Sequence, residues 1–217
     1  MRLIYRVIKK YIIKMTKRIN AKKKVSRSLG VSLWGRSNDP FIKRNTRPGQ
    51  HGAAPRRDTN HSIHLKAKQK VRKYYDIKES QFRTLFDKAK KLKGNTEDNF
   101  ASLLESRLAS VVYRANFAPT VFSARQLVSH KHILVNGKPI NISSYIVKAG
   151  DVISVSPNAK KIPLINEALQ EMERDVPVYL ELNSSDMSVK FLNKPVIADI
   201  PYPFEPEFNM IVEFYSK

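Results

Sequence analysis

The sequence predicts an α+β protein in which a basic, mainly helical N-terminal domain precedes a small module that combines a helix pair with a hairpin-bearing sheet. Apolar side chains recur at helical spacing between residues 64 and 130. From residue 132 they alternate at strand spacing around Asn136-Gly137, which favours a tight hairpin because both residues tolerate positive φ. The 217 residues suffice for one large or two small domains, and a hydrophobic content of 41% suffices for packed cores.

The predicted helices rest on apolar stripes and on start and stop signals. Thr96 can cap a helix whose apolar stripe continues from Phe100 to Val112, and Gly94 marks the end of the helix before it. Pro163 suits the first turn of a later helix. We expect helices over residues 64–75, 80–92, 96–112 and 123–130, and one that begins at Pro163.

The predicted strands are short segments rich in β-branched and aromatic residues. Asn136-Gly137 joins the first two strands, and the Gly150-Asp151 turn precedes the third. The last strand, at the end of the chain, is expected to pair with another strand. We expect strands over residues 132–135, 138–140, 152–155, 178–182 and 210–215.

These elements and the distribution of charge divide the chain into three regions. Residues 15–98 form the basic helical domain, which residues 187–217 complete. Residues 99–186 form the second region, with its core module at 99–160. Residues 1–14 are an N-terminal extension without acidic residues. It is either a basic amphipathic segment of membrane-surface or targeting character, or a short extension upstream of the usual start.

Positive charge is concentrated in the first half of the chain. The 40 Lys and Arg residues outnumber the 19 Asp and Glu residues, a formal net charge of +21. Residues 1–98 hold 28 basic and 7 acidic side chains, whereas residues 161–217 hold 5 and 10. So large an excess repels itself and predicts a polyanionic partner, with nucleic acid as the leading candidate. The acidic end is expected to face solvent or a basic protein neighbour.

The absence of several residue patterns excludes several classes of function. Without cysteine there are no disulfides, cysteine–zinc sites or thiol catalysis. His61 and His64 have H-x-x-H spacing, but two histidines without carboxylate or cysteine partners fall short of a zinc site. No phosphate-binding glycine loop or nucleophile elbow is present, and no apolar run approaches the roughly 20 residues that cross a bilayer. We therefore expect no cofactor, metal, membrane contact, small-molecule substrate or enzymatic activity.

Several motifs in the middle of the chain and on its flanks fit a known pattern. The central motifs are LESRL (104–108), VVYR (111–114), ARQLVSH (124–130) and VNG (135–137). They resemble the S-four RNA-binding module, which also occurs in some pseudouridine synthases and in tyrosyl-tRNA synthetases. The flanking motifs are PGQHG (48–52), KQKVR (68–72), KLKGNT (91–96) and IVEFYSK (211–217). With them, the chain from about Met15 to its end resembles the bacterial-type S-four family of small-subunit ribosomal proteins.

The resemblance implies a structural constituent of the small ribosomal subunit. Family members bind small-subunit ribosomal RNA at a multi-helix junction in its 5′ domain and help to nucleate assembly. They also lie beside ribosomal protein S-five near the mRNA entry channel, where the contact influences decoding accuracy. The expected location is the cytoplasmic ribosome, with an organelle matrix ribosome as the alternative. The chain departs from the family in the extension 1–14 and in lacking the cysteines with which some members bind zinc.

Two other functions compete with this one. An RNA-modifying enzyme that carries the same module would need a fused catalytic domain, for which 217 residues leave no room. A translational repressor that binds its own mRNA through the same surface is compatible with the ribosomal function.

The candidate RNA-binding residues are basic and polar side chains of both regions. Arg107 and Arg114 are two helical turns apart and are expected to project from the same side of one helix toward RNA; in the alternative, one of them pairs with Glu105. The helix over 64–75 carries five cations with no acid between them, which favours phosphate contact over a solvated face. Glu205 and Glu207 are expected to contact a basic neighbour such as S-five. The full RNA-binding set is Arg44, Arg47, Gln50, His51, Lys66, Lys68, Lys70, Arg72, Lys73, Lys91, Lys93, Arg107, Arg114, Arg125, Gln126, His130 and Lys131.

Overall fold

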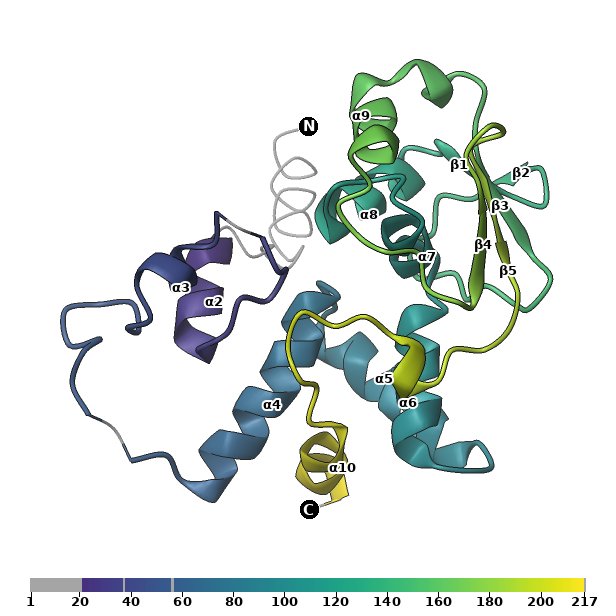
Figure 1. The fold of residues 1–217 in the computed structure, drawn as a ribbon. Helices are drawn as coiled ribbons and strands as arrows, with labels where there is room; N and C mark the ends of the chain where they lie inside the picture. The colour runs from purple at the N-terminus through teal and green to yellow at the C-terminus, as the bar shows by residue number, and fades with distance from the viewer. Residues whose placement is uncertain (1–20, 37, 56, 217) are drawn as a thin grey trace, which may run out of the picture. The chain divides into compact units, whose positions relative to one another are not determined.

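A computed structural model describes residues 21–36, 38–55 and 57–216, so the predicted N-terminal extension lies outside the described residues. The chain divides into two compact units, which we call the N-terminal unit (up to residue 56) and the C-terminal unit (from residue 57). Among its described residues, the N-terminal unit contains two short helices, α2 (Lys22–Leu29) and α3 (Pro40–Lys43), with turns around them (Figure 1).

The C-terminal unit is a mixed helical and sheet structure, which confirms the predicted α+β class. The helices predicted over 64–75, 80–92 and 123–130 are present within a few residues of their expected bounds, and Pro163 is the first residue of its helix. Asn95, rather than Thr96, caps the helix that follows Gly94, because its side chain accepts the Glu97 N–H. The helices are α4 (Asn60–Tyr74), α5 (Glu79–Lys91), α6 (Thr96–Glu105), α7 (Leu108–Arg114), α8 (Val121–Ser129), α9 (Pro163–Glu171) and α10 (Phe208–Ser216), with short 3-10 helices η1 (Ala159–Lys161) and η2 (Ile197–Asp199).

The single helix predicted over 96–112 is wrong, because the chain leaves helical geometry between α6 and α7. Arg107 has an extended backbone with ψ of 136°. A later segment pairs with the chain at this break. The Val147 N–H donates to the Ser106 carbonyl oxygen at 2.8 Å, and Arg107 forms an isolated antiparallel bridge with Ile146. The apolar stripe is continuous in sequence, but this tertiary pairing turns the backbone.

The strand predicted over 210–215 is also wrong, because this segment lies within helix α10. Its β-branched and aromatic residues favour a strand locally. In the fold, Phe208 and Tyr215 instead face a common apolar surface, with ring centroids 6.2 Å from Phe100 and 4.8 Å from Phe86. Packing of α10 against α4 and α6 therefore overrides the local propensity; Figure 1 shows α10 lying beside α4.

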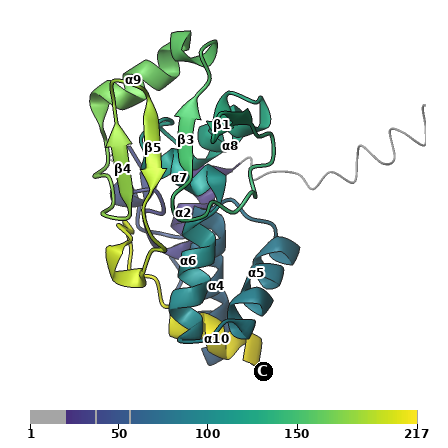
Figure 2. The ribbon, with the colours of Figure 1, turned by 90° about the vertical axis from the view of Figure 1, so that its right-hand side faces the viewer.

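An antiparallel sheet forms the other half of the C-terminal unit. Its strands β1 (Ile133–Val135), β2 (Lys138–Pro139), β3 (Val152–Val155), β4 (Leu180–Asn183) and β5 (Ser188–Phe191) lie in the order β2-β1-β3-β5-β4. The first three confirm the predicted hairpin and third strand, and β4 lies close to the predicted 178–182. Helices α7 and α8 cover one face of the sheet, and Figure 2 shows β3, β5 and β4 side by side. The opposite face presents exposed side chains, among them Val152, Glu181 and Lys190.

The two predicted domain boundaries do not match the elements of the fold. The boundary between residues 98 and 99 falls inside α6, which packs on α5. Residues 187–217 were assigned to the helical domain, but they contain β5, which pairs with β3 and β4 in the sheet. The end of that segment packs on α4, as the prediction requires, through α10 and through Tyr202 and Phe204, which lie against Tyr74.

Candidate nucleic-acid interface

The break between α6 and α7 places Arg107 in an unusual environment. Its side chain caps no helix and is nearly buried, with 6% of the residue exposed. Its guanidinium makes no hydrogen bond or ion pair with any residue that the structure describes. Burial, and after it the positive charge of Arg125, lowers the pKa of Arg107 from its ordinary value to about 10. A buried cation without a counter-charge is costly, because its lost hydration is not replaced.

Arg125, on α8, is the charged neighbour of Arg107 and is held in place by Asp76. Its Nη1 donates to the Asp76 carbonyl oxygen at 2.9 Å and to the carboxylate Oδ2 at 3.1 Å. Asp76 follows α4 with a φ of 49°, which directs both of its oxygens to this arginine. The Asp76 carboxylate is therefore bonded to Arg125, and Arg107 beside it has no carboxylate partner among the described residues. The remaining donors of the pair suit a bidentate anion such as a phosphate.

Three further predicted residues continue this region along α8. Gln126 lies on an exposed position of the helix, and His130 and Lys131 are exposed at its end. The His130 and His132 rings lie with their centroids 5.9 Å apart. The structure thus brings Arg107 and Arg125 together and places the others on the same helix; we call Arg107, Arg125, Gln126, His130 and Lys131 the α8 surface.

Arg114 does not belong to this surface. The prediction that Arg107 and Arg114 project from the same side of one helix is wrong, because the helix is broken between Ser106 and Leu108. Arg114 is 2% exposed, and its Nη2 lies 2.6 Å from Oε1 of the fully buried Glu105. The alternative in which one arginine pairs with Glu105 therefore holds for Arg114.

The cations of α4 are compensated by acids that lie far away in the sequence. Lys68 is buried, with its ammonium 2.7 Å from Glu79 and 4.3 Å from the centre of the Phe214 ring. Lys70 pairs with Glu207 at 3.2 Å. The sequence of the helix itself offers these cations no acidic partner, but the fold supplies acids from α5 and from the C-terminal segment. Of the other predicted residues of α4, Lys66 pairs with Asp58, and Arg72 pairs with Glu79. The pKa of Lys73 is lowered by burial and by the charge of Arg72.

In the N-terminal unit, arginine side chains organise the turn predicted from Pro48 to Gly52. Arg27 on α2 donates from Nη2 to the Arg47 carbonyl oxygen at 3.1 Å, and Arg47 donates to Ala54 at 2.6 Å. A Cβ on Gly52 would lie 1.9 Å from the Arg47 carbonyl oxygen, so only glycine fits there. Arg47 thus has a structural role. Three predicted residues of this turn are exposed: Arg44, Gln50 and His51.

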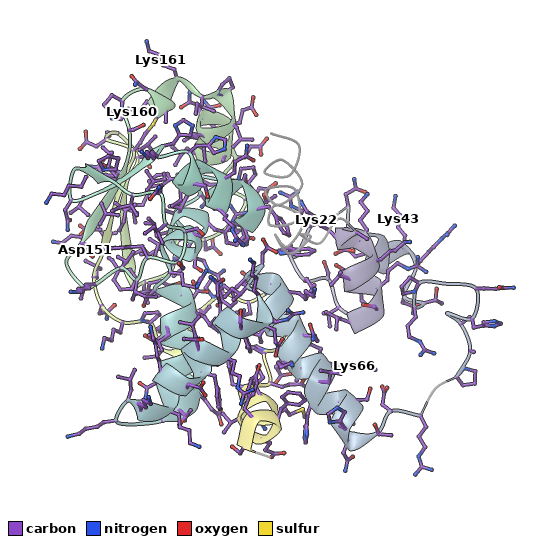
Figure 3. The ribbon with its side chains drawn as sticks, turned by 180° about the vertical axis from the view of Figure 1, so that it is seen from behind. Lys22, Lys43, Lys66, Asp151, Lys160 and Lys161 are labelled. Carbon is purple, nitrogen blue, oxygen red and sulfur yellow. The ribbon has the colours of Figure 1, made fainter. Side chains whose placement is uncertain are left out.

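Other basic side chains lie on the surface outside these clusters. Two predicted residues are exposed here: Lys91, which ends α5, and Lys93, which follows it. The prediction omitted Lys22 and Lys43 in the N-terminal unit and Lys160 and Lys161 on η1, which Figure 3 shows pointing outward. The neighbouring basic residues in the sequence were the signal that could have indicated these lysines as candidate RNA-binding residues. Nothing in the sequence could have indicated Asp76 as the partner of Arg125, because 49 residues separate the two.

The acidic pair predicted as a protein contact is split by the structure. Glu205 is exposed, whereas Glu207 is bonded to Lys70. His61 and His64 are in contact with α10: the His61 ring lies 5.7 Å from Phe214, and His64 pairs with Glu213 at 3.2 Å. Among the described residues, no group of three or more His, Cys, Asp or Glu side chains could hold a metal ion. No described helix is long and apolar enough to span a membrane.

Two family models match consecutive segments of the chain, which together contain most of the candidate RNA-binding residues. Residues 17–105 match the family model described as the ribosomal protein S4/S9 N-terminal domain, and residues 106–153 match the S4 domain. The chain is 50% identical over 205 residues to small ribosomal subunit protein uS4 of Rickettsia massiliae (strain Mtu5), which covers 94% of the chain and the whole relative. The chain belongs to the uS4 family of small ribosomal subunit proteins.

Other members of the uS4 family give the same result. The protein of that name from Rickettsia felis (strain ATCC VR-1525 / URRWXCal2) is 50% identical over 205 residues, and that from Ehrlichia canis (strain Jake) 49% over 200 residues. These matches cover 94% and 92% of the chain and 100% and 99% of the relatives. The resemblance inferred from the sequence motifs is confirmed. As a uS4 family member the chain is a structural, RNA-binding constituent of the ribosome and not an enzyme.

Proposed function

We propose that this protein is a primary binder of small-subunit ribosomal RNA that nucleates subunit assembly on the 5′ domain of that RNA. The observation that carries the proposal is the nearly buried Arg107 guanidinium, which has no acidic partner among the described residues and lies beside Arg125. Membership of the uS4 family supports the ribosomal setting. Because the relatives are bacterial proteins, we propose the bacterial cytoplasm as the location.

A phosphate of the RNA backbone supplies what the two arginines lack. It brings negative charge and several acceptor oxygens to a place where Arg107 and Arg125 lie together and Asp76 is bonded to Arg125 alone. Arginine suits this contact better than lysine, because its planar fork can donate two parallel hydrogen bonds and is weakly hydrated. The α8 surface then extends the contact along the helix through Gln126, His130 and Lys131.

The proposal is tested by filter binding to the 5′-domain fragment of small-subunit rRNA with excess tRNA as competitor. Tight binding that survives the competitor is expected. If the protein neutralises six or more phosphates, a rise in monovalent salt from about 50 to 200 mM should lower the affinity roughly a thousand-fold. Binding that tRNA abolishes, or an affinity that does not change with salt, would contradict the proposal.

Arg107→Met, with Arg83→Met as the matched control, tests the site itself. Both substitutions remove one positive charge, but Arg83 is exposed on α5, outside the α8 surface. We expect Arg107→Met to weaken specific binding on the order of ten-fold or more, since it removes a desolvated, charge-assisted contact. Arg83→Met should change affinity far less. Equal losses in both variants would mean that net charge, rather than this site, determines binding.

We also propose that the acidic end contacts ribosomal protein S-five and so influences translational accuracy. Exposed Glu205 is the better candidate, because Glu207 is already paired with Lys70. Charge reversal, Glu205→Lys, should weaken binding to purified S-five and raise stop-codon readthrough in a reporter strain. Unchanged readthrough with unchanged S-five binding would remove Glu205 from the contact.

A further inference from the structure

The outer face of the sheet, on the side away from α7 and α8, carries a row of exposed apolar side chains. Val152 begins β3, Leu192 follows β5 and Val178 precedes β4. Because β5 is antiparallel to both of its neighbours, these three positions lie at the same end of the sheet. They are 41%, 43% and 75% exposed, and Figure 2 views the sheet from this side. Exposed apolar side chains that gather in one place often mark a contact with another macromolecule.

A hollow of about 480 Å³ lies on the same face, beside the apolar row. Glu181 on β4 and Lys190 on β5 lie directly opposite each other in the register, and both line the hollow together with Ser188. Neither Glu181 nor Lys190 forms an ion pair with any residue that the structure describes. The face therefore offers an unpaired carboxylate and a hydroxyl group next to apolar side chains.

The segment that builds this part of the sheet is acidic, although the chain as a whole has a net charge of +21. Residues 162–200 hold seven acidic and three basic side chains. Four of the acids are exposed around β4: Glu173, Asp175, Glu181 and Asp186. A surface of this charge attracts cationic partners and repels phosphates.

We propose that the outer face of the sheet docks an extended, lysine- and arginine-rich segment of another protein of the small subunit. The aliphatic stems of such side chains cover the apolar row, and their charged ends reach Glu181 and the neighbouring acids. The proposal uses the ribosomal setting of the uS4 family and does not depend on the RNA site at Arg107. It is also separate from Glu205, which lies between η2 and α10.

A solvated sheet face is the competing explanation. Antiparallel sheets commonly expose one face to water, and such a face carries polar side chains at its outward positions. Ser188 and Lys190 follow that pattern, but Val152, Leu192 and Val178 do not. If the face is only solvated, it stays accessible in the assembled subunit and has no neighbouring protein.

Photo-cross-linking in assembled small subunits tests the proposal. Full-length protein with Val178→p-benzoylphenylalanine is incorporated into subunits in cells, and the purified subunits are irradiated. We expect a cross-link to one other small-subunit protein, which mass spectrometry should map to a segment rich in lysine and arginine. Leu164→p-benzoylphenylalanine is the matched control, because Leu164 is 38% exposed on α9, outside the sheet. It should not give this cross-link.

Two charge reversals then test the role of the acidic surface. Glu181→Lys and Glu167→Lys, each combined with the cross-linking residue at position 178, change the net charge equally. Both glutamates are exposed, but Glu167 lies on α9. Glu181→Lys should lower the yield of the cross-link about three-fold or more, because a like charge then faces the basic segment. Glu167→Lys should leave the yield unchanged.

Several outcomes would overturn the proposal. They are a cross-link from position 178 to ribosomal RNA, to a second copy of this chain, to another part of the same chain or to a segment without excess positive charge, and the absence of any cross-link in assembled subunits. Equal losses in both charge variants would also overturn it. Because the cross-link is measured after assembly, these outcomes are independent of whether the protein nucleates assembly on the 5′ domain.

Discussion

Two arginines on either side of α7 are both buried, yet their surroundings are opposite. Arg114 is enclosed with Glu105, which accepts from its Nε and Nη2, while its Nη1 donates to the Pro201 carbonyl oxygen at 2.8 Å. Arg107 has a lowered pKa, and its nearest charged influence is another cation, Arg125. Burial alone therefore does not separate the structural Arg114 from Arg107, which we propose to bind RNA. The presence or absence of a counter-charge does.

The surroundings of Arg114 connect several parts of the C-terminal unit. The Tyr75 hydroxyl donates to Glu105 at 2.7 Å, and the Tyr179 hydroxyl donates to it at 3.1 Å. These groups come from the end of α4, from α6 and α7, and from the segment before β4, while Pro201 lies after η2. The pair of Arg114 and Glu105 thus connects α4, α6 and α7 to the segments that lie before β4 and after η2.

The largest effect is expected from Arg114→Met. Glu105 would remain buried as an uncompensated charge, so the free energy of unfolding should fall by about 3–5 kcal/mol. Urea unfolding monitored by circular dichroism measures this change. The double variant Glu105→Gln/Arg114→Met should recover part of the loss, because it removes both charges. A loss below about 1 kcal/mol in the single variant would show that the pair is not enclosed as described.

Arg107→Met should have the opposite sign. The substitution removes a buried charge that has no acidic partner and keeps an apolar side chain of similar length. The free energy of unfolding should therefore rise by about 1–3 kcal/mol at pH 7. The same denaturation experiment measures it, and a clear loss of stability would mean that Arg107 has an internal partner. A gain in stability together with a loss of RNA affinity would identify Arg107 as a residue retained for binding.

The stability gain of Arg107→Met should shrink as the pH rises through about 10. Arg107 has a pKa of about 10 in the folded state, below its ordinary value in the unfolded chain. In this window the unfolded parent binds more protons than the folded one, so its stability rises with pH relative to the variant. The pKa values of Tyr75 and Tyr202 are raised by burial, which lowers stability above pH of about 10 in both proteins equally. A pH-independent difference between the two proteins would contradict the lowered pKa.

Much of the fold could be predicted from sequence because its signals are local. The Asn136-Gly137 hairpin, the stripe of α5 and Pro163 at the start of α9 depend on neighbouring residues. The failures share a different cause. The break at Arg107 depends on pairing with Ile146, and the helical state of α10 depends on packing against Phe100 and Phe86.

The same distinction applies to the candidate site. Charge density along the chain predicted a nucleic-acid partner and the sequence motifs indicated the correct family, but neither could tell which cations remain uncompensated. Lys68 and Lys70 are neutralised by Glu79 and Glu207, which are 11 and 137 residues away. Only the folded chain shows that Arg107 lacks such a partner among the described residues.

The smallest effect is expected at the pair of Lys70 and Glu207, which is the partly exposed counterpart of the pair of Arg114 and Glu105. The Lys70 and Glu207 side chains are 18% and 33% exposed, so water screens their attraction. Glu207→Gln should therefore lower the free energy of unfolding by no more than about 1 kcal/mol. Glu205→Gln, which removes an exposed charge two residues earlier, is the matched control and should have still less effect. Because several acids compensate the cations of α4, we expect the two variants to have the same specific affinity for the 5′-domain fragment.

A higher affinity in Glu207→Gln alone would show that Lys70 contacts RNA once its ion pair is removed. The cations of α4 would then be RNA-binding groups like Arg107 and not structural groups like Arg114.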